Sequence, residues 1–307
     1  MAYITQIQKL IENEPHLTNR EVADKLGCSR RTVRRVAGNQ RARLLGPTGG
    51  PKVLIFDIET APMEIYVWGL FKQHPNIEQI KKDWCVLSWS AKWLFDSNVM
   101  SARINAAQAY DRDDSSILEE IWNLFDEADI VIAHNAQRFD VRKLNARWMQ
   151  YGYSKPSPFL IIDTLKQAKT IMAPASWKLK YLNKFLKLAE QKDESNYGMW
   201  VRAVEGDDTA IEEMLEYNKQ DVVALEELYV RIRPWMKSHP NLALYVDSTE
   251  SLCPTCTSDN LQWNGYYYTP AGKYASFRCL NCGALGRSPY SSLTTDQRKA
   301  LLRSTAR

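Results

Sequence analysis

KVLIFDIET, residues 52–60, is a nearly continuous apolar run that carries two acids at its end. The apolar residues from Val53 to Ile58 predict a buried β-strand. Because alternate side chains of a strand point to opposite faces, Asp57 and Glu59 lie on the same face. Two carboxylates held this close repel each other unless a cation neutralises them. The run therefore predicts a core strand whose end carries a metal site.

Two further segments place acids on predicted helices. HNAQRFD, residues 134–140, follows the apolar strand 129–133 and leads into a helix, so Asp140 falls in the first turn of that helix. The apolar residues of 207–233 recur every three or four positions, which predicts a long helix. Within it, YNKQD places Tyr217 and Asp221 four residues apart and hence on one face.

Taken in this order, the three segments resemble the motifs of the DEDD superfamily of 3'-5' exonucleases, which have a ribonuclease H-like fold. The matching residues are Asp57 and Glu59 of D-x-E, Asp140 of the second motif, and Tyr217 and Asp221 of Y-x-x-x-D. Position 216 is Glu rather than His, which places the chain with the tyrosine subgroup. The resemblance covers roughly residues 53 to 235. IIDTLKQAK (161–169) and LKYLNKFL (179–186) also resemble ribonuclease H-like exonucleases of bacteria and phages.

The resemblance implies a catalytic pair of Mg²⁺ or Mn²⁺ ions, for which carboxylates are suitable hard ligands. It implies that Asp57 bridges both ions, that Glu59 and Asp221 complete one site, and that Asp140 holds the other. It also implies that Tyr217 orients the attacking water. A phenol with a pKa near 10 is a poor base at neutral pH, which favours orientation over proton removal.

Other polar residues near the motifs have two interpretations each. His134 and Asn135 are candidate substrate-binding residues, and His134 is equally well interpreted as a structural residue at the strand end. Asp163 is interpreted as the cap of the helix that follows it, rather than as a residue that supports the metal site. For most of the aromatic residues in 61–83 we expect core packing, although in the family this region can wedge against a terminal nucleotide.

The two ends of the chain are basic and the middle is acidic. Residues 1–50 carry a net charge of +5 and residues 250–307 carry +4, whereas residues 51–249 carry −5. Basic segments beside an acidic catalytic body suit a polyanionic partner, because they supply the attraction that the body lacks.

The N-terminal segment has a helix-turn-helix pattern. A capping box at Thr18-Asn-Arg-Glu21 opens a helix that continues to Leu26, Gly27-Cys28 forms a turn, and Ser29 caps the next helix. The predicted DNA-contacting residues of that last helix are Arg30, Arg31, Arg34 and Arg35. The alternative is a small three-helix interaction module with a solvated basic face. Pro and Gly residues make the segment that follows a predicted linker.

Four cysteines near the other end have the spacing of a zinc ribbon. They form two C-x-x-C pairs, Cys253 with Cys256 and Cys279 with Cys282. Because all four ligands are thiolates, we expect a structural Zn²⁺ with no open position. Cys28 and Cys85 are left over and are predicted to be packing residues.

Aromatic residues lie between the two cysteine pairs and alternate with basic ones. They are Trp263, Tyr266, Tyr267, Tyr268, Tyr274 and Phe277, with Lys273 and Arg278. Such residues can stack on single-stranded nucleic acid. Strand alternation would instead bury half of them, so both interpretations stay open at this point.

The predicted fold class is α/β: a ribonuclease H-like mixed sheet flanked by helices, with an N-terminal all-α helix-turn-helix and a C-terminal zinc ribbon. The predicted parts are a helix-turn-helix module (1–43), a linker (44–52), an exonuclease domain (53–248), the ribbon (250–290) and a basic tail (291–307). No apolar run approaches the roughly 20 residues that a membrane helix needs. With six cysteines and no signal peptide, the chain is expected in the cytoplasm of a bacterium or a phage-infected host.

The hypothesis from the sequence is a metal-dependent 3'-5' exonuclease that releases 5'-mononucleotides from single-stranded or frayed DNA ends. An RNase or a structure-specific endonuclease of the same fold is the alternative enzyme. A DNA-binding regulator or replication accessory protein is the alternative of another class. The expected partner is nucleic acid, with a DNA polymerase or another replication protein as a further candidate. The grouping of these modules resembles phage proteins.

Overall fold

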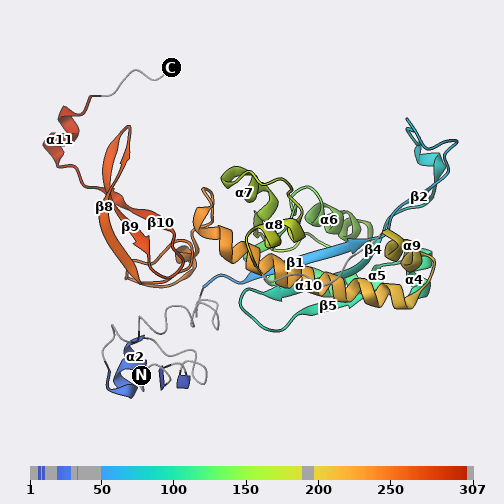
Figure 1. The fold of residues 1–307 in the computed structure, drawn as a ribbon, viewed down its shortest axis with the longest axis horizontal. Helices are drawn as coiled ribbons and strands as arrows, with labels where there is room; N and C mark the ends of the chain where they lie inside the picture. Colours follow the sequence, from blue (N-terminus) through green and yellow to red (C-terminus); the bar gives the residue numbers. More distant parts are fainter. Residues whose placement is uncertain are drawn as a thin grey trace. The chain divides into compact units, whose positions relative to one another are not determined.

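The computed structural model of the chain describes residues 6–7, 9–10, 19–28, 33, 50–188 and 197–302 (Figure 1). The chain divides into two compact units. The larger comprises Lys52–Ile232, and the other comprises Met1–Pro51 together with Arg233–Arg307.

The larger unit is built on a five-stranded mixed sheet in the order β5-β4-β1-β6-β7 (Figure 1). Its strands are β1 (Val53–Thr60), β4 (Val86–Trp93), β5 (Met100–Arg103), β6 (Ile130–Ala133) and β7 (Leu160–Asp163). Strand β1 pairs antiparallel with β4 and parallel with β6, which in turn pairs parallel with β7. The predicted mixed sheet is therefore confirmed, and β1, the strand that bears the first two acids, lies at its centre.

Helices cover both faces of this sheet. On β1, Phe56 packs edge to face against Phe125 of α5 (Ser115–Glu127), with ring centroids 4.7 Å apart. The next residue, Asp57, accepts a hydrogen bond from Asn218 of α10 (Asp208–Ile232). Because neighbouring strand residues point to opposite faces, α5 and α10 lie on opposite sides of the sheet. The acids of β1 therefore face the long helix α10.

Shorter helices complete the unit. They are α4 (Ala106–Asp111), α6 (Asp140–Gln150), α7 (Thr164–Ile171), α8 (Leu179–Phe185) and α9 (Tyr197–Val204). Helix α6 packs against α5, while α8 and α9 both pack against α10. The predicted long helix over 207–233 is confirmed by α10, and Asp140 is the first residue of α6 as expected.

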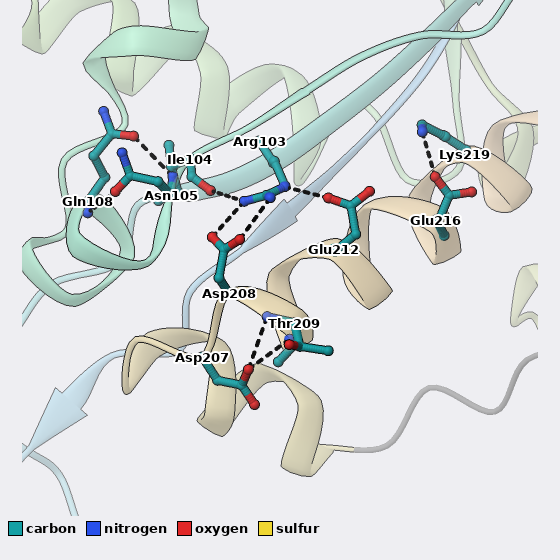
Figure 2. Close-up of polar contacts among 11 residues, drawn as sticks. Arg103, Ile104, Asn105, Gln108, Asp207, Asp208, Thr209, Glu212, Glu216 and Lys219 are labelled. Atoms are coloured by element: carbon teal, nitrogen blue, oxygen red, sulfur yellow. Dashed lines mark hydrogen bonds and ion pairs between the residues drawn. The ribbon is translucent and has the colours of Figure 1, made fainter.

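Arg103 ties α10 to the edge strand β5, as Figure 2 shows. Its Nη1 donates to Asp208 Oδ1 at 2.8 Å and its Nε donates to Glu212 Oε2 at 2.7 Å, one turn further along the helix. An arginine that binds two carboxylates at once has a fixed orientation, because its guanidinium is planar. This contact fixes the first two turns of α10 against β5. It therefore helps to position Tyr217 and Asp221, which lie further along the same helix.

Two ion pairs are buried within the unit. The guanidinium of Arg147 on α6 binds Asp114, whose side chain is fully buried, with Nε 2.7 Å from Oδ2 and Nη2 2.5 Å from Oδ1. Asp114 Oδ2 also accepts the backbone N–H of Val86 at 2.8 Å. On the opposite face of the sheet, Lys92 of β4 pairs with Glu226 of α10. Each charge is thus satisfied, which a buried charge requires.

An arm formed by residues 61–83 projects from the unit (Figure 1). It contains the two-stranded pair β2 (Glu64–Ile65) and β3 (Ile80–Lys82), with the turn η1 (Ile77–Gln79) between them. The prediction that most of its aromatic residues pack into the core is wrong: Trp68 is fully exposed and Phe71 is 84% exposed. Both residues lie in the segment between β2 and η1, and a two-stranded pair this short offers no core for their side chains to enter.

The described part of the N-terminal segment contains α2 (Asn19–Leu26), which ends at Gly27 with a positive φ of 61°. This confirms the predicted helix and turn. Ile7, Val22 and Val33 are fully buried in a small cluster that includes Ala23, and Cys28 packs against it as predicted. Arg30, Arg31, Arg34 and Arg35 lie outside the described residues, so their role as DNA contacts stays a prediction.

The C-terminal part contains a three-stranded antiparallel sheet in the order β10-β9-β8. Its elements are β8 (Leu261–Thr269), β9 (Gly272–Cys279), β10 (Leu285–Ser291) and α11 (Thr295–Ala300), preceded by the short turns η2 (Arg233–Trp235) and η3 (Leu242–Tyr245). In the described ranges, no helix has the length and apolarity to cross a membrane.

Candidate functional site

The candidate site lies where three parallel strands end. Because β1, β6 and β7 run in the same direction, their carboxyl ends meet at one edge of the sheet. Strand β1 carries Asp57 and Glu59 there, and β7 ends at Asp163. The pairing of β1 with β6 stops at Ile55, so the two strands have separated before the acids are reached.

Three carboxylates converge at this edge. Asp57, Glu59 and Asp221 each offer an oxygen within 4.8 Å of the others. The first two come from β1 and the third from α10, which the packing of that helix against β1 and β4 brings over the strand. The fourth predicted acid, Asp140, accepts the backbone N–H of Ile58, and its charge acts on Asp57. The structure therefore brings the four predicted acids together.

The electrostatics of this group favour a cation. Burial, followed by the charges of Asp140, Glu59 and Asp221, raises the pKa of Asp57 well above its usual range. Burial and the charge of Asp221 raise the pKa of Glu59 to about 8, and burial raises that of Asp140 to about 7. Bound divalent ions would reverse these shifts by stabilising the ionised carboxylates. Oxygen ligands of this kind fit Mg²⁺ or Mn²⁺.

Asn218 is a site residue that the sequence argument missed. It is fully buried, and its Nδ2 donates to Asp57 Oδ2 at 2.6 Å. This hydrogen bond lowers the pKa of Asp57 and so opposes the effect of the neighbouring acids. The one indication in the sequence is its place in YNKQD, between Tyr217 and Asp221. The spacing within this motif does not show that Asn218 donates a hydrogen bond to Asp57 on another element.

Trp200 is a second missed residue. Its indole N–H donates to the carboxylate of Glu59. Its ring also packs edge to face on that of Tyr217, with centroids 6.3 Å apart. One side chain of α9 thus contacts both a predicted metal ligand and the predicted water-orienting phenol. No pattern in the sequence indicated that α9 reaches the site, since it depends on the packing of α9 against α10.

The structure also locates the remaining candidates. Both ring nitrogens of His134 have partners within the protein, Thr164 Oγ1 at 2.9 Å and the carbonyl oxygen of Trp177 at 2.8 Å. Burial lowers the pKa of the His134 ring. These contacts are the ones that the structural interpretation expects, and a contact between His134 and substrate stays a prediction.

The structure confirms that Asp163 caps the helix that follows it, α7. Its Oδ1 accepts the backbone N–H of Lys166 at 3.1 Å, in the first turn of α7. The same carboxylate accepts the backbone N–H groups of Asn135 and Gln137. Asn135 has a φ of 82°, a left-handed conformation that Asn tolerates better than most residues. Asp163 therefore also fixes the turn that leads to Asp140.

The second candidate metal group consists of the four cysteines of the C-terminal part. Their sulfur atoms lie within 4.8 Å of one another, with Cys253 Sγ 3.7 Å from Cys282 Sγ and Cys256 Sγ 3.6 Å from Cys279 Sγ. A tetrahedral Zn²⁺ with Zn–S bonds of about 2.3 Å would separate its sulfurs by about 3.8 Å. The observed spacing fits that geometry.

The two cysteine pairs have matching backbone turns. The N–H of Thr257 donates to the Cys253 carbonyl at 2.8 Å, and the N–H of Gly283 donates to the Cys279 carbonyl at 2.9 Å. Both donors have positive φ, 57° for Thr257 and 83° for Gly283. Each pair is therefore folded into the same tight turn, which directs both of its sulfurs toward the other pair.

Comparison with known proteins agrees with the architecture. Residues 91–233 match the RNase_H superfamily model. The match covers just under half of the chain and includes Asp140, Tyr217 and Asp221. Together with the five-stranded mixed sheet, it confirms the predicted ribonuclease H-like α/β fold.

A search of the curated proteins found no match. Among solved structures, the family B DNA polymerase from the hyperthermophilic archaeon Pyrobaculum calidifontis is similar over 60% of this chain, with 15% identity and a TM-score of 0.44. The match covers 25% of the polymerase chain, so this chain spans about a quarter of that protein's length.

Proposed function

We propose that this protein is a metal-dependent 3'-5' exonuclease that acts on single-stranded or frayed DNA ends. The observation that carries the proposal is the convergence of Asp57, Glu59 and Asp221 on the α10 face of the sheet, with Asp140 beside Asp57. The ribonuclease H-like fold supports a nuclease function for such a group. The 3'-5' direction rests on the resemblance to the DEDD exonucleases, and the choice of DNA rests on the predicted N-terminal helix-turn-helix.

Two Mg²⁺ or Mn²⁺ ions would supply the attacking hydroxide and neutralise charge on the leaving oxygen. Asp57 would hold both ions, Glu59 and Asp221 would complete one site, and Asp140 would complete the other. The grouping of Asp57 with Glu59 and Asp221 supports this division, since these three offer oxygens to a common point.

The chain's own residues would position the reacting groups. Tyr217 lies one helical turn before Asp221 on the same face of α10 and would orient the attacking water. The edge-to-face contact with Trp200 limits the orientations of the Tyr217 ring. Asn218 would favour the ionised form of Asp57 and fix the orientation of its carboxylate by donating to one of its oxygens.

The four cysteines would hold a structural Zn²⁺ that takes no part in cleavage, because four thiolates leave no coordination position for water. With only a small core beneath them, the turns at Cys253 and Cys279 would depend on this ion for their fold. Metal analysis of the purified protein should find one zinc per chain, and Cys253→Ser should lose it.

The test of the proposed function uses matched DNA and RNA single strands that carry a 5' label. With Mg²⁺ or Mn²⁺ present, the protein should shorten the DNA strand one nucleotide at a time, and Asp57→Asn should abolish the reaction. Asp96→Asn, an exposed acid in the turn after β4, is the matched control and should retain full activity. Undiminished activity of Asp57→Asn would contradict the proposal, and stepwise cleavage of RNA alone would favour the alternative RNase.

A further inference from the structure

The three-stranded sheet of the C-terminal part exposes aromatic side chains along almost the whole of β8. Trp263 is 48% exposed, Tyr266 50% and Tyr268 67%, and Tyr267 between them is 53% exposed. The sequence left open whether strand alternation would bury half of these residues. It does not, because within the described ranges no second layer packs on this sheet, and Phe277 is the one aromatic residue of the set that is buried.

The strand register assigns these side chains to faces. Trp263 pairs with Phe277, and Tyr268 pairs with Lys273. Tyr266 pairs with Ala275. Residues 273, 275 and 277 of β9 lie on one face of the sheet, because side chains alternate along a strand, and residues paired with them lie on that same face. This face therefore carries a row of three exposed rings. We call this row, Trp263, Tyr266 and Tyr268, the aromatic row. Tyr267 pairs with Tyr274 and lies on the opposite face.

Contacts within the sheet hold the aromatic row in place. The rings of Tyr266 and Tyr268 have centroids 6.5 Å apart, and those of Trp263 and Phe277 are 5.1 Å apart. Phe277 lies over Gly286 of β10, where even a single Cβ would come within 2.2 Å of its ring. Trp263 therefore packs against Phe277, whose ring is itself buried and held against β10. Because the rings are already held in position, the protein would lose little side-chain conformational entropy when a ligand stacks on them.

The charge of the surface selects the ligand. Residues 260–295 contain no Asp or Glu. Of their three cations, Lys273 lies on the face of the aromatic row, and Arg278 and Arg287 lie on the opposite face. The ammonium of Lys273 lies 3.7 Å from the centroid of the Tyr266 ring, so a cation stands within the aromatic row itself. A ligand that suits both the exposed rings and the cation beside them is a chain that carries flat rings and a regular array of negative charges. Duplex DNA does not suit them, because its bases are already stacked and paired.

We propose that the aromatic row is a binding platform for single-stranded nucleic acid, on which successive bases stack while Lys273 contacts the backbone phosphates. Stacking on aromatic side chains tolerates any base, so the platform binds without sequence preference. It does not read the sugar, so DNA and RNA single strands bind comparably. The inference extends the proposed exonuclease function, but binding at this sheet does not require cleavage at the acidic site.

The test measures fluorescence anisotropy of a labelled oligothymidylate of about 20 nucleotides. All proteins are full-length and carry Asp221→Ala, so that loss of binding and loss of cleavage are measured separately. Tyr266→Leu with Tyr268→Leu should weaken binding about tenfold or more. Tyr267→Leu, which alters the same strand on the opposite face, should change it less than about twofold. An oligouridylate should give the same pattern, and affinity for a duplex of equal length should not change.

Two controls keep the test decisive. Zinc content must stay the same in every variant, which shows that the cysteine group and its sheet remain folded. Lys273→Gln should reduce the slope of log affinity against log salt concentration by about one, as loss of one phosphate contact does. Unchanged single-strand binding in the double variant would overturn the proposal, and so would an equal loss in Tyr267→Leu.

Discussion

Replacing Asn218 with Ala tests whether the acidic group is a metal site in which the Asn218 hydrogen bond favours the ionised form of Asp57. Asn218 is buried and donates to Asp57 Oδ2 at 2.6 Å, which is a short bond to a charged acceptor. Hydrogen bonds to charged groups contribute about 1.5–3 kcal/mol. At about 1.4 kcal/mol per factor of ten, this corresponds to roughly 10- to 100-fold in an equilibrium constant.

The expected result of Asn218→Ala is therefore a rise of roughly 10- to 100-fold in the Kd for Mn²⁺, in the range typical of residues that support metal ligands. Isothermal titration of Mn²⁺ into the metal-free acidic site measures it directly. The loss should be larger at about pH 6 than at about pH 8, because removing the hydrogen bond raises the pKa of Asp57 and protons then compete better with the metal.

Asn183→Ala is the matched control. Asn183 is also a buried asparagine, 2% exposed, and its Nδ2 donates to the carbonyl of Ala224 on the same helix α10 at 3.0 Å. Both variants should lower the melting temperature, but only Asn218→Ala should weaken Mn²⁺ binding. A Kd for Mn²⁺ that is unchanged in Asn218→Ala, or raised equally in both variants, would refute the reasoning.

Three other predictions concern the same unit. Trp200→Phe retains an aromatic ring and removes the N–H that donates to Glu59, so kcat should fall about tenfold with little change in KM for the strand; an unchanged kcat would remove Trp200 from the site. In the folded protein the pKa of Glu59 is raised to about 8, whereas in the unfolded chain it is near 4. The folded, metal-free protein therefore binds a proton more tightly than the unfolded chain does. Its free energy of unfolding should fall as the pH rises from about 4 to about 8. Saturating Mn²⁺ should abolish that loss in melting curves, and a metal-free protein that becomes more stable over this range would contradict the assignment. Arg147→Met leaves the fully buried Asp114 without its cation and should cost about 3–5 kcal/mol in urea unfolding, whereas the exposed Arg142→Met on the same helix should cost less than about 0.5 kcal/mol.

Local patterns in the sequence predict the elements that carry the candidate site well. The apolar run before Asp57 and the helical periodicity around Tyr217 are strong signals, because each element buries one side that must be apolar. Asp163 was predicted as a cap from its position before a helix, and the structure confirms it. Gly27 was likewise predicted as a turn and has the positive φ that glycine allows.

Features that depend on the packing of distant segments were not predictable. Trp200 reaches Glu59 because α9 packs on α10, and no local pattern encodes that contact. The predicted core packing is wrong for Trp68 because this residue lies in the segment between β2 and η1, which projects away from the core; that is a property of the tertiary structure rather than of the residue. The exposure of Tyr266 was undecided for the same reason, since strand alternation buries a face only where another layer covers it.

The direction and mode of cleavage are measured with one oligonucleotide labelled in turn at each end, together with a circular single strand, in the presence of Mn²⁺. A 3'-5' exonuclease gives a descending ladder from the 5'-labelled strand, immediate release of a labelled mononucleotide from the 3'-labelled strand, and no cleavage of the circle. Asp221→Ala should abolish the reaction, whereas the exposed-acid control Asp96→Asn should retain it. Cleavage of the circle, or undiminished activity in Asp221→Ala, would contradict a 3'-5' exonuclease that depends on this acidic group.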